Sequence, residues 1–207
     1  MKKKKRICLA LDTTSDVTSV ACLSDDGACA VLQENCTRGQ GEALMGLIQQ
    51  VLDKMQIKPA DLTQIAVAVG PGSFTGVRIG LATARGLGLA LNIPVMGVDN
   101  FTATAHHHKK AVKVVLDSKR SDFFVQAFSE EGEALSRPTI QNIKQLEGAL
   151  PFVACGSGAV QLADQIHCDV VAAQQPLAVA MGEIALFQPH KTTEAHPLYL
   201  READVTL

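Results

Sequence analysis

The chain has 207 residues, of which 47% are hydrophobic and 19% charged, which excludes a disordered protein and fits one or two domains with a buried core. Aromatic residues make up only 4% and the net charge is −2, so a base-stacking platform or a stand-alone basic nucleic-acid binder is not expected. No apolar stretch reaches the roughly 20 residues of a membrane span, and the six cysteines form no C-x-x-C pair. We therefore expect a cytoplasmic protein with reduced thiols.

The first half predicts a hairpin with a third strand, followed by alternating helices and strands. A basic run, MKKKKR, precedes the first apolar segment, and we interpret it as a solvated lead-in. Apolar residues that alternate with polar ones predict strands, and apolar residues at i, i+3, i+4 spacing predict helices. The predicted elements are strands at 7–11, 19–24 and 28–35, a helix at 42–56, a strand at 65–69, a helix at 75–91, a strand at 94–98 and a helix near 100–108.

The second half repeats this order in a shorter form. We expect strands at 112–116, 122–128 and 152–155, and weaker helices near 158–166 and 176–187. Because each half begins with a hairpin and continues with strands and helices in alternation, the predicted fold is α/β, with mixed sheets flanked by helices.

An internal repeat supports two lobes. Residues 9–28 align with residues 114–133 without a gap, so that Asp12 corresponds to Asp117. Each copy reads as a β-hairpin with an acidic first turn. A two-lobed duplication with a shortened second lobe follows. The predicted lobes are residues 1–108 and 109–207.

A second repeat lies after the hairpins. The stretch AVAVGPGS at 66–73 resembles FVACGSGA at 152–159, and each is a buried strand that ends in G-x-G before a helix. In the later copy these glycines are Gly156 and Gly158.

The Asp12 turn is a candidate nucleotide site. Asp12 follows a buried strand and is next to Thr13 and Thr14. A carboxylate beside hydroxyls and turn amides suits magnesium and phosphate, whereas the same residues are also common in ordinary tight turns. Both interpretations stay open. The candidate residues are Asp12, Thr13, Thr14, Asp117, Gly156 and Gly158.

The stretch GPGSFTGVRIG at 70–80 fits no catalytic or phosphate-binding glycine motif. It has no P-loop lysine, and Thr75 replaces the third glycine of the dinucleotide fingerprint. Pro71 and Thr75 replace the glycines of a nucleophile elbow around Ser73. We interpret the stretch as a strand-to-helix turn that needs glycine for its dihedral angles.

Small residues form a strip on the predicted helix 75–91. Gly76, Gly80, Ala84 and Gly88 recur every four residues and share one face. Because interior glycines destabilise a helix, the strip indicates close approach of another backbone, either within the chain or from a partner. Helix 42–56 is the predicted neighbour. The apolar stripe of that helix is Leu44, Leu47, Ile48, Val51, Leu52 and Met55.

Three consecutive histidines, His106, His107 and His108, are not expected to bind a metal ion. Neighbouring residues on a helix point about 100° apart, so three in a row do not converge on one ion. We interpret them as a solvated helix end.

These motifs resemble a known family. The duplicated hairpins with acidic turns resemble the actin, sugar kinase and heat-shock chaperone superfamily. The resemblance to the bacterial TsaB (YeaZ) family covers nearly the whole chain. It rests on LALDTTSDVTSVAC, on IAVAVGPGSFTGVRIGLATARGLGLALNIPVMGVDN, on VVLDSKRSDFFVQAF and on the ending PLYLREADVTL.

The resemblance implies a non-catalytic scaffold that takes part in forming N6-threonylcarbamoyladenosine at position 37 of tRNAs reading ANN codons. In that family the catalytic relative TsaD transfers the threonylcarbamoyl group, and the ATPase TsaE joins the complex. The resemblance places the partner interface on the helices at 42–56 and 75–91. Whether the chain alone is a homodimer or a monomer stays open, and the apolar helices make a homodimer one of the two alternatives. Contact with tRNA would be indirect, through the complex.

The resemblance also implies that the chain requires no cofactor of its own. The family's nucleotide pocket is degraded, so ATP or ADP with magnesium would bind at low affinity or at the complex interface. TsaD carries H-x-x-x-H for a metal, and Asn100 and Thr104 stand at those places. The alternatives are a small ATP-dependent phosphotransferase or ATPase that uses Asp12 and Asp117, and a glycoprotease-like metallopeptidase, which the missing histidines disfavour.

Overall fold

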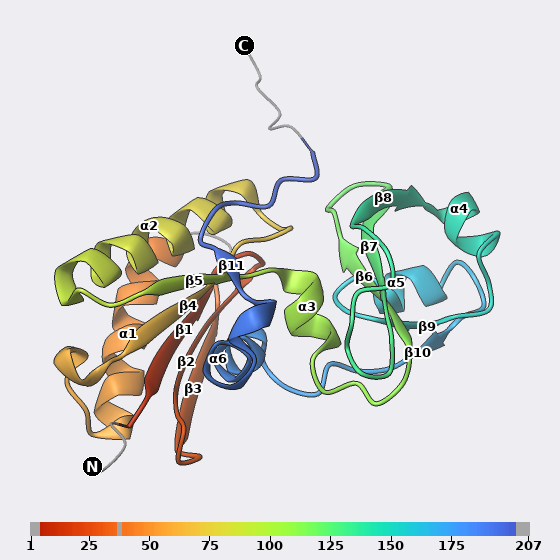
Figure 1. The fold of residues 1–207 in the computed structure, drawn as a ribbon. Coiled ribbons are helices and arrows are strands. Elements are labelled where there is room, and N and C mark those ends of the chain that lie inside the picture. Colours follow the sequence, from red (N-terminus) through yellow and green to blue (C-terminus); the bar gives the residue numbers. More distant parts are fainter. Residues whose placement is uncertain (1–4, 37–38, 202–207) are drawn as a thin grey trace. The chain divides into compact units, whose positions relative to one another are not determined.

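The computed structural model describes residues 5–36 and 39–201, which form two compact units (Figure 1). The first contains the described residues up to Asn100 together with Gln175–Leu198, and the second contains Phe101–Gln174 and the described residues from Tyr199 on. The sequence predicted one boundary after residue 108. The contacts divide the chain differently because a C-terminal helix returns to the first sheet. Most of the MKKKKR lead-in lies outside the described residues.

The first unit is built on a mixed six-stranded sheet with the order β11-β5-β4-β1-β2-β3. Strands β1, β2 and β3 form an antiparallel meander, β1, β4 and β5 are parallel, and β11 closes the far edge against β5. The strands are β1 (Ile7–Asp12), β2 (Val17–Ser24), β3 (Cys29–Asn35), β4 (Gln64–Ala68), β5 (Val95–Val98) and β11 (Thr193–Glu194). The expected mixed sheet is confirmed.

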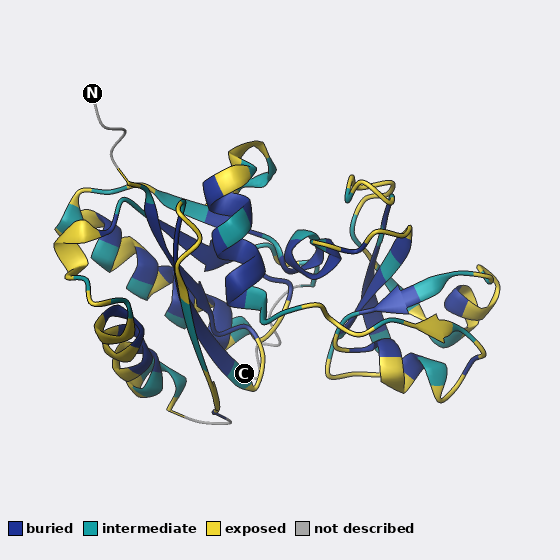
Figure 2. Ribbon diagram, turned by 90° about the horizontal axis from the view of Figure 1, so that it is seen from below, coloured by how far each residue is buried: buried dark blue, intermediate teal, exposed yellow. Residues whose placement is uncertain are grey.

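Helices cover both faces of this sheet. α1 (Gln40–Met55) and α2 (Phe74–Leu91) lie on one face, and α6 (Leu177–Phe187) lies on the other (Figure 1). Leu9 and Leu11 point toward α1 and α2 and join one apolar cluster with them. Gly182 of α6 packs directly on the side chain of Leu23, so glycine lets this helix approach the sheet closely. Figure 2 shows the central strands buried between the helices; α1 and α2 have exposed outer faces, whereas most residues of α6 are buried.

The second unit has a five-stranded sheet with the order β10-β9-β6-β7-β8. One apolar cluster joins this sheet to Phe101 and Ala105 of α3, and another joins it to Leu146 of α4 and Leu162 of α5. The strands are β6 (Val112–Asp117), β7 (Asp122–Phe128), β8 (Thr139–Asn142), β9 (Val153–Cys155) and β10 (Asp169–Val170). The helices are α3 (Asn100–Ala105), α4 (Ile143–Glu147) and α5 (Ala159–Ala163).

The repeat seen in the sequence is a repeat of structure. In both hairpins the second strand ends in the same turn: the amide of Gly27 donates to Ser24 O, and that of Gly132 to Ser129 O. The strand pairing differs by one residue, since Leu11 pairs with Val20 whereas Leu116 pairs with Phe124. The turn between the two hairpin strands is therefore one residue shorter in the second unit, a difference that the gap-free sequence alignment does not show.

Candidate functional site

Helix α2 begins and ends at residues that cap it. The Ser73 hydroxyl accepts a hydrogen bond from the amide of Gly76 at 3.2 Å, as expected of an N-cap serine. Asn92 ends the helix in the left-handed conformation, with its amide directed to the carbonyls of Gly88 and Leu89. Ser73 is thus the N-cap of α2.

The strip of small residues on α2 faces the chain's own sheet. A β-carbon at Gly76 would overlap the carbonyl oxygen of Thr13, and one at Gly80 would lie 2.8 Å from the Thr13 hydroxyl. Gly88 packs on the side chain of Val95, and Ala84 is fully buried. The interpretation of this strip as partner-facing is therefore corrected. The glycines are explained by close packing of α2 on the β1–β2 turn and on β5.

The apolar stripe of α1 also faces inward. The predicted interface residues of this helix are buried in the core shared with the sheet, and Met55 is half-buried against it. Burial, not docking, accounts for their spacing. The buried residues are Leu44, Leu47, Ile48, Val51 and Leu52.

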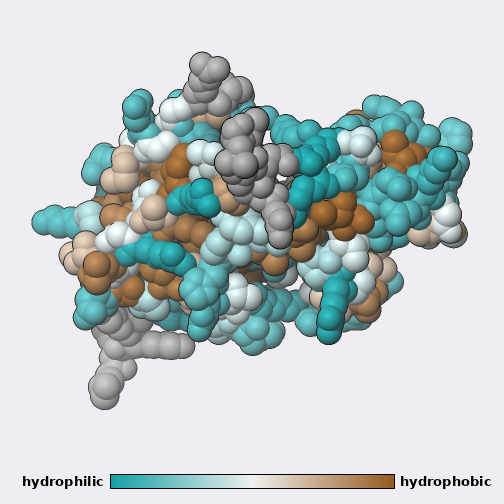
Figure 3. Space-filling model, turned by 90° about the horizontal axis from the view of Figure 1, so that it is seen from above, coloured by the Kyte–Doolittle hydropathy of each residue, from teal (hydrophilic) through white to brown (hydrophobic). Residues whose placement is uncertain are grey.

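The exposed faces of α1 and α2 carry other apolar residues. Leu89 of α2 is 86% exposed and Met45 of α1 is 52% exposed. Gly46 and Gly86 are exposed in the middle of these helices, and a β-carbon at either would meet nothing within 4 Å. From above, the first unit shows apolar side chains interspersed with hydrophilic ones around α2 (Figure 3). We call Met45, Gly46, Gly86 and Leu89 the outer face.

The outer face was not predicted from the sequence. The sequence does contain a pattern for this face of α2, since Ala82, Gly86 and Leu89 stand at i, i+4 and i+7. This pattern has three residues, whereas the inner strip has four small residues, so it is the weaker of the two. Two arginines flank these positions. Arg78 lies over the ring of Phe74, with its guanidinium carbon 3.8 Å from the ring centre, and Arg85 donates to the carbonyl of Ala195.

Asp12 lies at the buried end of β1, where its carboxylate is bonded by its own turn. Oδ1 accepts hydrogen bonds from the Thr14 amide at 2.9 Å and the Thr14 hydroxyl at 2.7 Å. Burial raises the pKa of Asp12 above its ordinary value, and the two bonds from Thr14 act in the opposite direction. The structure thus brings Asp12, Thr13 and Thr14 together, as predicted.

This turn is also the anchor of both helices. The amide of Ser73, at the start of α2, donates to Thr14 O at 2.7 Å, and the Thr13 hydroxyl donates to Gly76 O at 2.6 Å. The side chain of Gln40, at the start of α1, donates to Ser15 O at 2.6 Å. Much of the polar surface of the turn is therefore engaged within the chain.

The twin turn around Asp117 is built differently. Asp117 is half-buried, its Oδ1 accepts from the amide of Lys119 at 2.7 Å, and the Lys119 ammonium lies 3.4 Å from Oδ2. Gly156 has a positive φ of 106°, and a β-carbon at Gly158 would lie 3.0 Å from the Asp117 amide. Within the second unit the structure brings together Asp117, Gly156 and Gly158. Asp12 belongs to the other unit.

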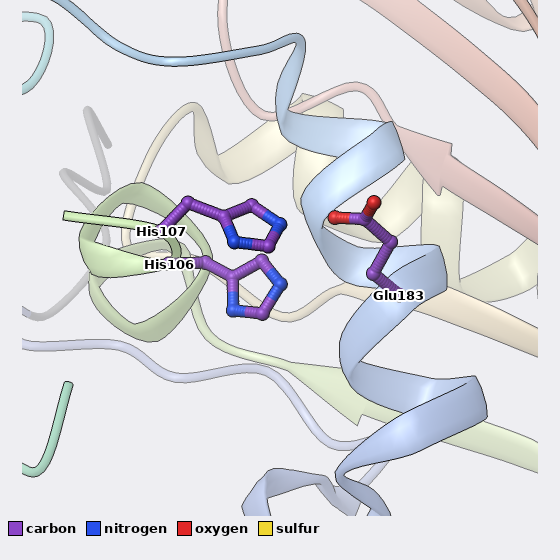
Figure 4. Close-up of side chains that lie close together, drawn as sticks. All are labelled: His106, His107 and Glu183. Atoms are coloured by element: carbon purple, nitrogen blue, oxygen red, sulfur yellow. The ribbon is translucent and has the colours of Figure 1, made fainter. Parts of the chain in front are cut away.

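The histidines lie at the end of α3. The rings of His106 and His107 have centroids 4.0 Å apart and are tilted by 45° (Figure 4). Glu183, drawn in the same figure, belongs to α6 of the first unit, where it accepts a hydrogen bond from the side chain of Gln175 at 2.6 Å. His108 is buried, contrary to the predicted solvated helix end, and burial lowers its pKa. We assign no metal site to these residues.

Among the described residues, no helix combines the length and the apolar character needed to cross a bilayer. The two longest described helices, α1 and α2, each bury one side against the sheet and expose the other.

Comparison with known proteins agrees with the fold and the motifs. Among solved structures, YeaZ from Pseudomonas aeruginosa is 22% identical with a TM-score of 0.77, over 94% of this chain and 100% of that chain. The activator of the 2-hydroxyisocaproyl-CoA dehydratase from Clostridium difficile is 9% identical with a TM-score of 0.58, over 89% of this chain and 96% of that chain. These likenesses establish the fold.

Sequence comparison gives the family. TsaB of Escherichia coli (strain K12), a tRNA threonylcarbamoyladenosine biosynthesis protein, is 28% identical over 93% of this chain and 94% of its own length. TsaB of Bacillus subtilis (strain 168) is 28% identical over 62% of this chain and 58% of its own length. The family model described as TsaD, tRNA N6-adenosine threonylcarbamoyltransferase, matches residues 31–193. Since that match covers most of the sequence, the chain belongs to the TsaD family, in which it is of the TsaB (YeaZ) type.

Proposed function

We propose that the chain is a non-catalytic subunit for the formation of N6-threonylcarbamoyladenosine in tRNA, and that it binds a TsaD-like enzyme through the outer face. The E. coli and B. subtilis relatives are named for this biosynthesis, and the matching family model is named for the transferase. In this proposal the modified position is 37 of tRNAs reading ANN codons, and the protein works in the cytoplasm.

The observation that supports docking is the pair of exposed glycines. An interior helix glycine destabilises a helix by about 0.5–1 kcal/mol relative to alanine. Gly80 and Gly88 are explained by packing on their own sheet, whereas Gly46 and Gly86 face open space. A backbone from another chain could approach closely there, and the exposed Leu89 and Met45 would supply apolar burial.

The absence of catalysis is proposed from the residues at the place of the family's metal ligands. Asn100 and Thr104 are both buried, and the amide nitrogen of Asn100 is bonded to Thr14 and Pro71. These two bonds fix the side chain of Asn100 within the chain, and neither asparagine nor threonine supplies the imidazole nitrogen of the family's H-x-x-x-H motif. This bonding supports a structural role for position 100 and gives no support to a metallopeptidase.

We also propose that the chain requires no cofactor. Three oxygens of the Asp12 turn already accept hydrogen bonds within the chain: Asp12 Oδ1 from Thr14, Thr14 O from Ser73 and Ser15 O from Gln40. Any ATP or ADP with magnesium would bind weakly or at the complex interface, where a TsaE-like ATPase would join. The chain would contact tRNA only indirectly, through the other subunits of the complex. The same outer face would support a homodimer in isolation.

Reconstitution of the modification tests this proposal. The cognate TsaD, its TsaE and the threonylcarbamoyl-adenylate donor are incubated with unmodified tRNA, with and without this chain. We expect product only when the chain is present, and none from the chain without TsaD. Modification by the chain alone would refute a non-catalytic role, and full modification in its absence would refute the role of an activating subunit.

A further inference from the structure

Asn100 makes an unusual set of contacts for a residue at the start of a helix. Its side-chain nitrogen Nδ2 donates to the Thr14 hydroxyl oxygen at 2.7 Å and to the carbonyl oxygen of Pro71 at 2.9 Å. Its own amide donates to Gly70 O at 2.8 Å. The residue is 5% exposed. One residue, the first of α3 and two positions after β5, thus holds the β1–β2 turn and the loop before α2.

The chemistry of the partners requires donors at this position. A carbonyl oxygen such as that of Pro71 only accepts, and the Thr14 hydroxyl already gives its proton to Asp12 at 2.7 Å. Both protons of Nδ2 are therefore used. Oδ1 of Asn100 has no hydrogen-bond partner among the described residues, although it is buried. An unpaired buried acceptor is unfavourable, so the residue is explained by its two donors and not by its carbonyl oxygen.

The two groups that Asn100 holds are those that place α2. Thr14 O accepts from the amide of Ser73, the N-cap of the helix, and Pro71 lies two residues before that cap. The Thr13 hydroxyl bonds to Gly76 O in the first turn of the helix. Asn100 closes this network from the β5 side, on a segment that is otherwise separate from the β1–β2 turn.

We propose that Asn100 is a positioning residue that fixes the start of α2, and so sets the geometry in which the outer face meets its partner. The inference rests on the docking role proposed above. The donors of Asn100, and not its size, are what the position requires.

Two substitutions separate donors from size. Asn100→Ala removes both donors and leaves space. Asn100→Asp keeps the shape but places acceptor oxygens opposite the Pro71 carbonyl and the Thr14 hydroxyl, and it adds a charge near Asp12. If the position requires the size of asparagine, Asn100→Asp should disturb the start of α2 less than Asn100→Ala does. If it requires the two donors, Asn100→Asp should disturb it more. Asn142→Asp is the matched control, because Asn142 is an exposed N-cap of α4 where aspartate caps equally well.

The first readout is hydrogen exchange in the free protein. We expect the amides of Ser73 and Val77 to exchange at least tenfold faster in Asn100→Asp than in the wild type, with Asn100→Ala in between. The β6–β7 hairpin in the second unit should be unchanged in both variants. A larger effect of Ala than of Asp, or equal acceleration in the hairpin, would overturn the proposal.

The second readout is the dissociation constant for the cognate TsaD. We expect it to rise at least tenfold in Asn100→Asp, less in Asn100→Ala, and not at all in Asn142→Asp. A wild-type chain that fails to bind TsaD would refute the docking role itself. A wild type that binds, with an Asn100→Asp variant that binds equally well, would refute only the role of Asn100.

If Asn100→Asp does not fold, a double-mutant cycle of Asn100→Ala and Thr14→Val gives the test, because each substitution removes the same hydrogen bond, from Asn100 Nδ2 to the Thr14 hydroxyl. The affinity loss of the double variant should then be smaller than the product of the two separate losses. Independent, multiplicative losses would overturn the proposal.

Discussion

Gly76 of α2 lies against Thr13 of the β1–β2 turn so closely that a β-carbon at position 76 would overlap the Thr13 carbonyl oxygen. The Thr13 hydroxyl in turn donates to Gly76 O. Contact of this kind ties α2 to the buried polar turn between β1 and β2. It also separates two classes of glycine on one helix, those that pack inward and those that face open space.

This separation predicts opposite effects on stability. Gly76→Ala should lower the free energy of unfolding by about 1–3 kcal/mol, because the added carbon forces the turn and the helix apart. Gly86→Ala should raise it by about 0.5–1 kcal/mol, because the site is open and alanine is the better helix former. Urea unfolding of the two variants beside the wild type measures both. Equal effects, or a stabilising Gly76→Ala, would contradict the packing described for α2.

The exposed glycines predict a loss of docking without a loss of folding. Gly46→Leu and Gly86→Leu should leave the midpoint of unfolding unchanged or higher, and should weaken TsaD binding at least tenfold by blocking close approach of its backbone. Gln161→Leu, at an exposed position of α5, is the control for an added surface leucine. Surface plasmon resonance gives the affinities. Unchanged binding by both glycine variants would remove these residues from the interface.

Asp12 predicts a pH-dependent stability. Its pKa in the folded protein is raised above the ordinary 3.8 by burial, so the folded state holds the proton more tightly than the unfolded state. The contribution of Asp12 to stability is then most favourable below about pH 3.8, and declines as pH rises through the folded-state pKa. Asp12→Asn should become progressively more stable than the wild type from pH 4 upward. Urea unfolding at several pH values gives this difference, and a difference that shrinks with rising pH would contradict the assignment.

The bonding of the Asp12 turn predicts weak nucleotide binding by the isolated chain. Titration calorimetry with ATP and magnesium should give no micromolar binding, because Asp12 Oδ1 and Thr14 O already accept hydrogen bonds within the chain. Micromolar binding that Asp12→Ala abolishes would instead favour an ATPase or phosphotransferase of the same superfamily.

Much of the fold was predictable because its signals are local or repeated. The periodicities of 7–11 and 75–91 predicted a strand and a helix that the structure confirms to within one or two residues. Four short elements were not predicted, because two to five residues are too few to show a clear periodicity: β8, α4, β10 and β11. The equally short β9 was predicted because it ends in the repeated G-x-G.

The return of α6 to the first unit was also beyond the sequence. Its stretch LAVAMGEIALF is apolar on nearly every side, which indicates burial without saying against which sheet.

The candidate site shows a second limit of sequence reasoning. The spacing of Gly76, Gly80 and Gly88 correctly indicates close approach of another backbone or side chain, but periodicity cannot say whether that neighbour is in the same chain. Only the structure shows Thr13 and Val95 in that place. The Asp12 turn was found because the internal repeat places a second aspartate, Asp117, at the corresponding position; an aspartate after a single buried strand is a weak signal. The role of Asn100 depends on contacts across 86 positions in the sequence and gives no local signal.

The most direct test of the account is the affinity of Leu89→Glu for the cognate TsaD. Leu89 is 86% exposed on the outer face, and Leu135, which is 64% exposed in the second unit, is the control for the same substitution. The account predicts that Leu89→Glu folds with wild-type stability but binds TsaD at least a hundredfold more weakly, while Leu135→Glu binds normally. Normal binding by Leu89→Glu would contradict docking through the outer face.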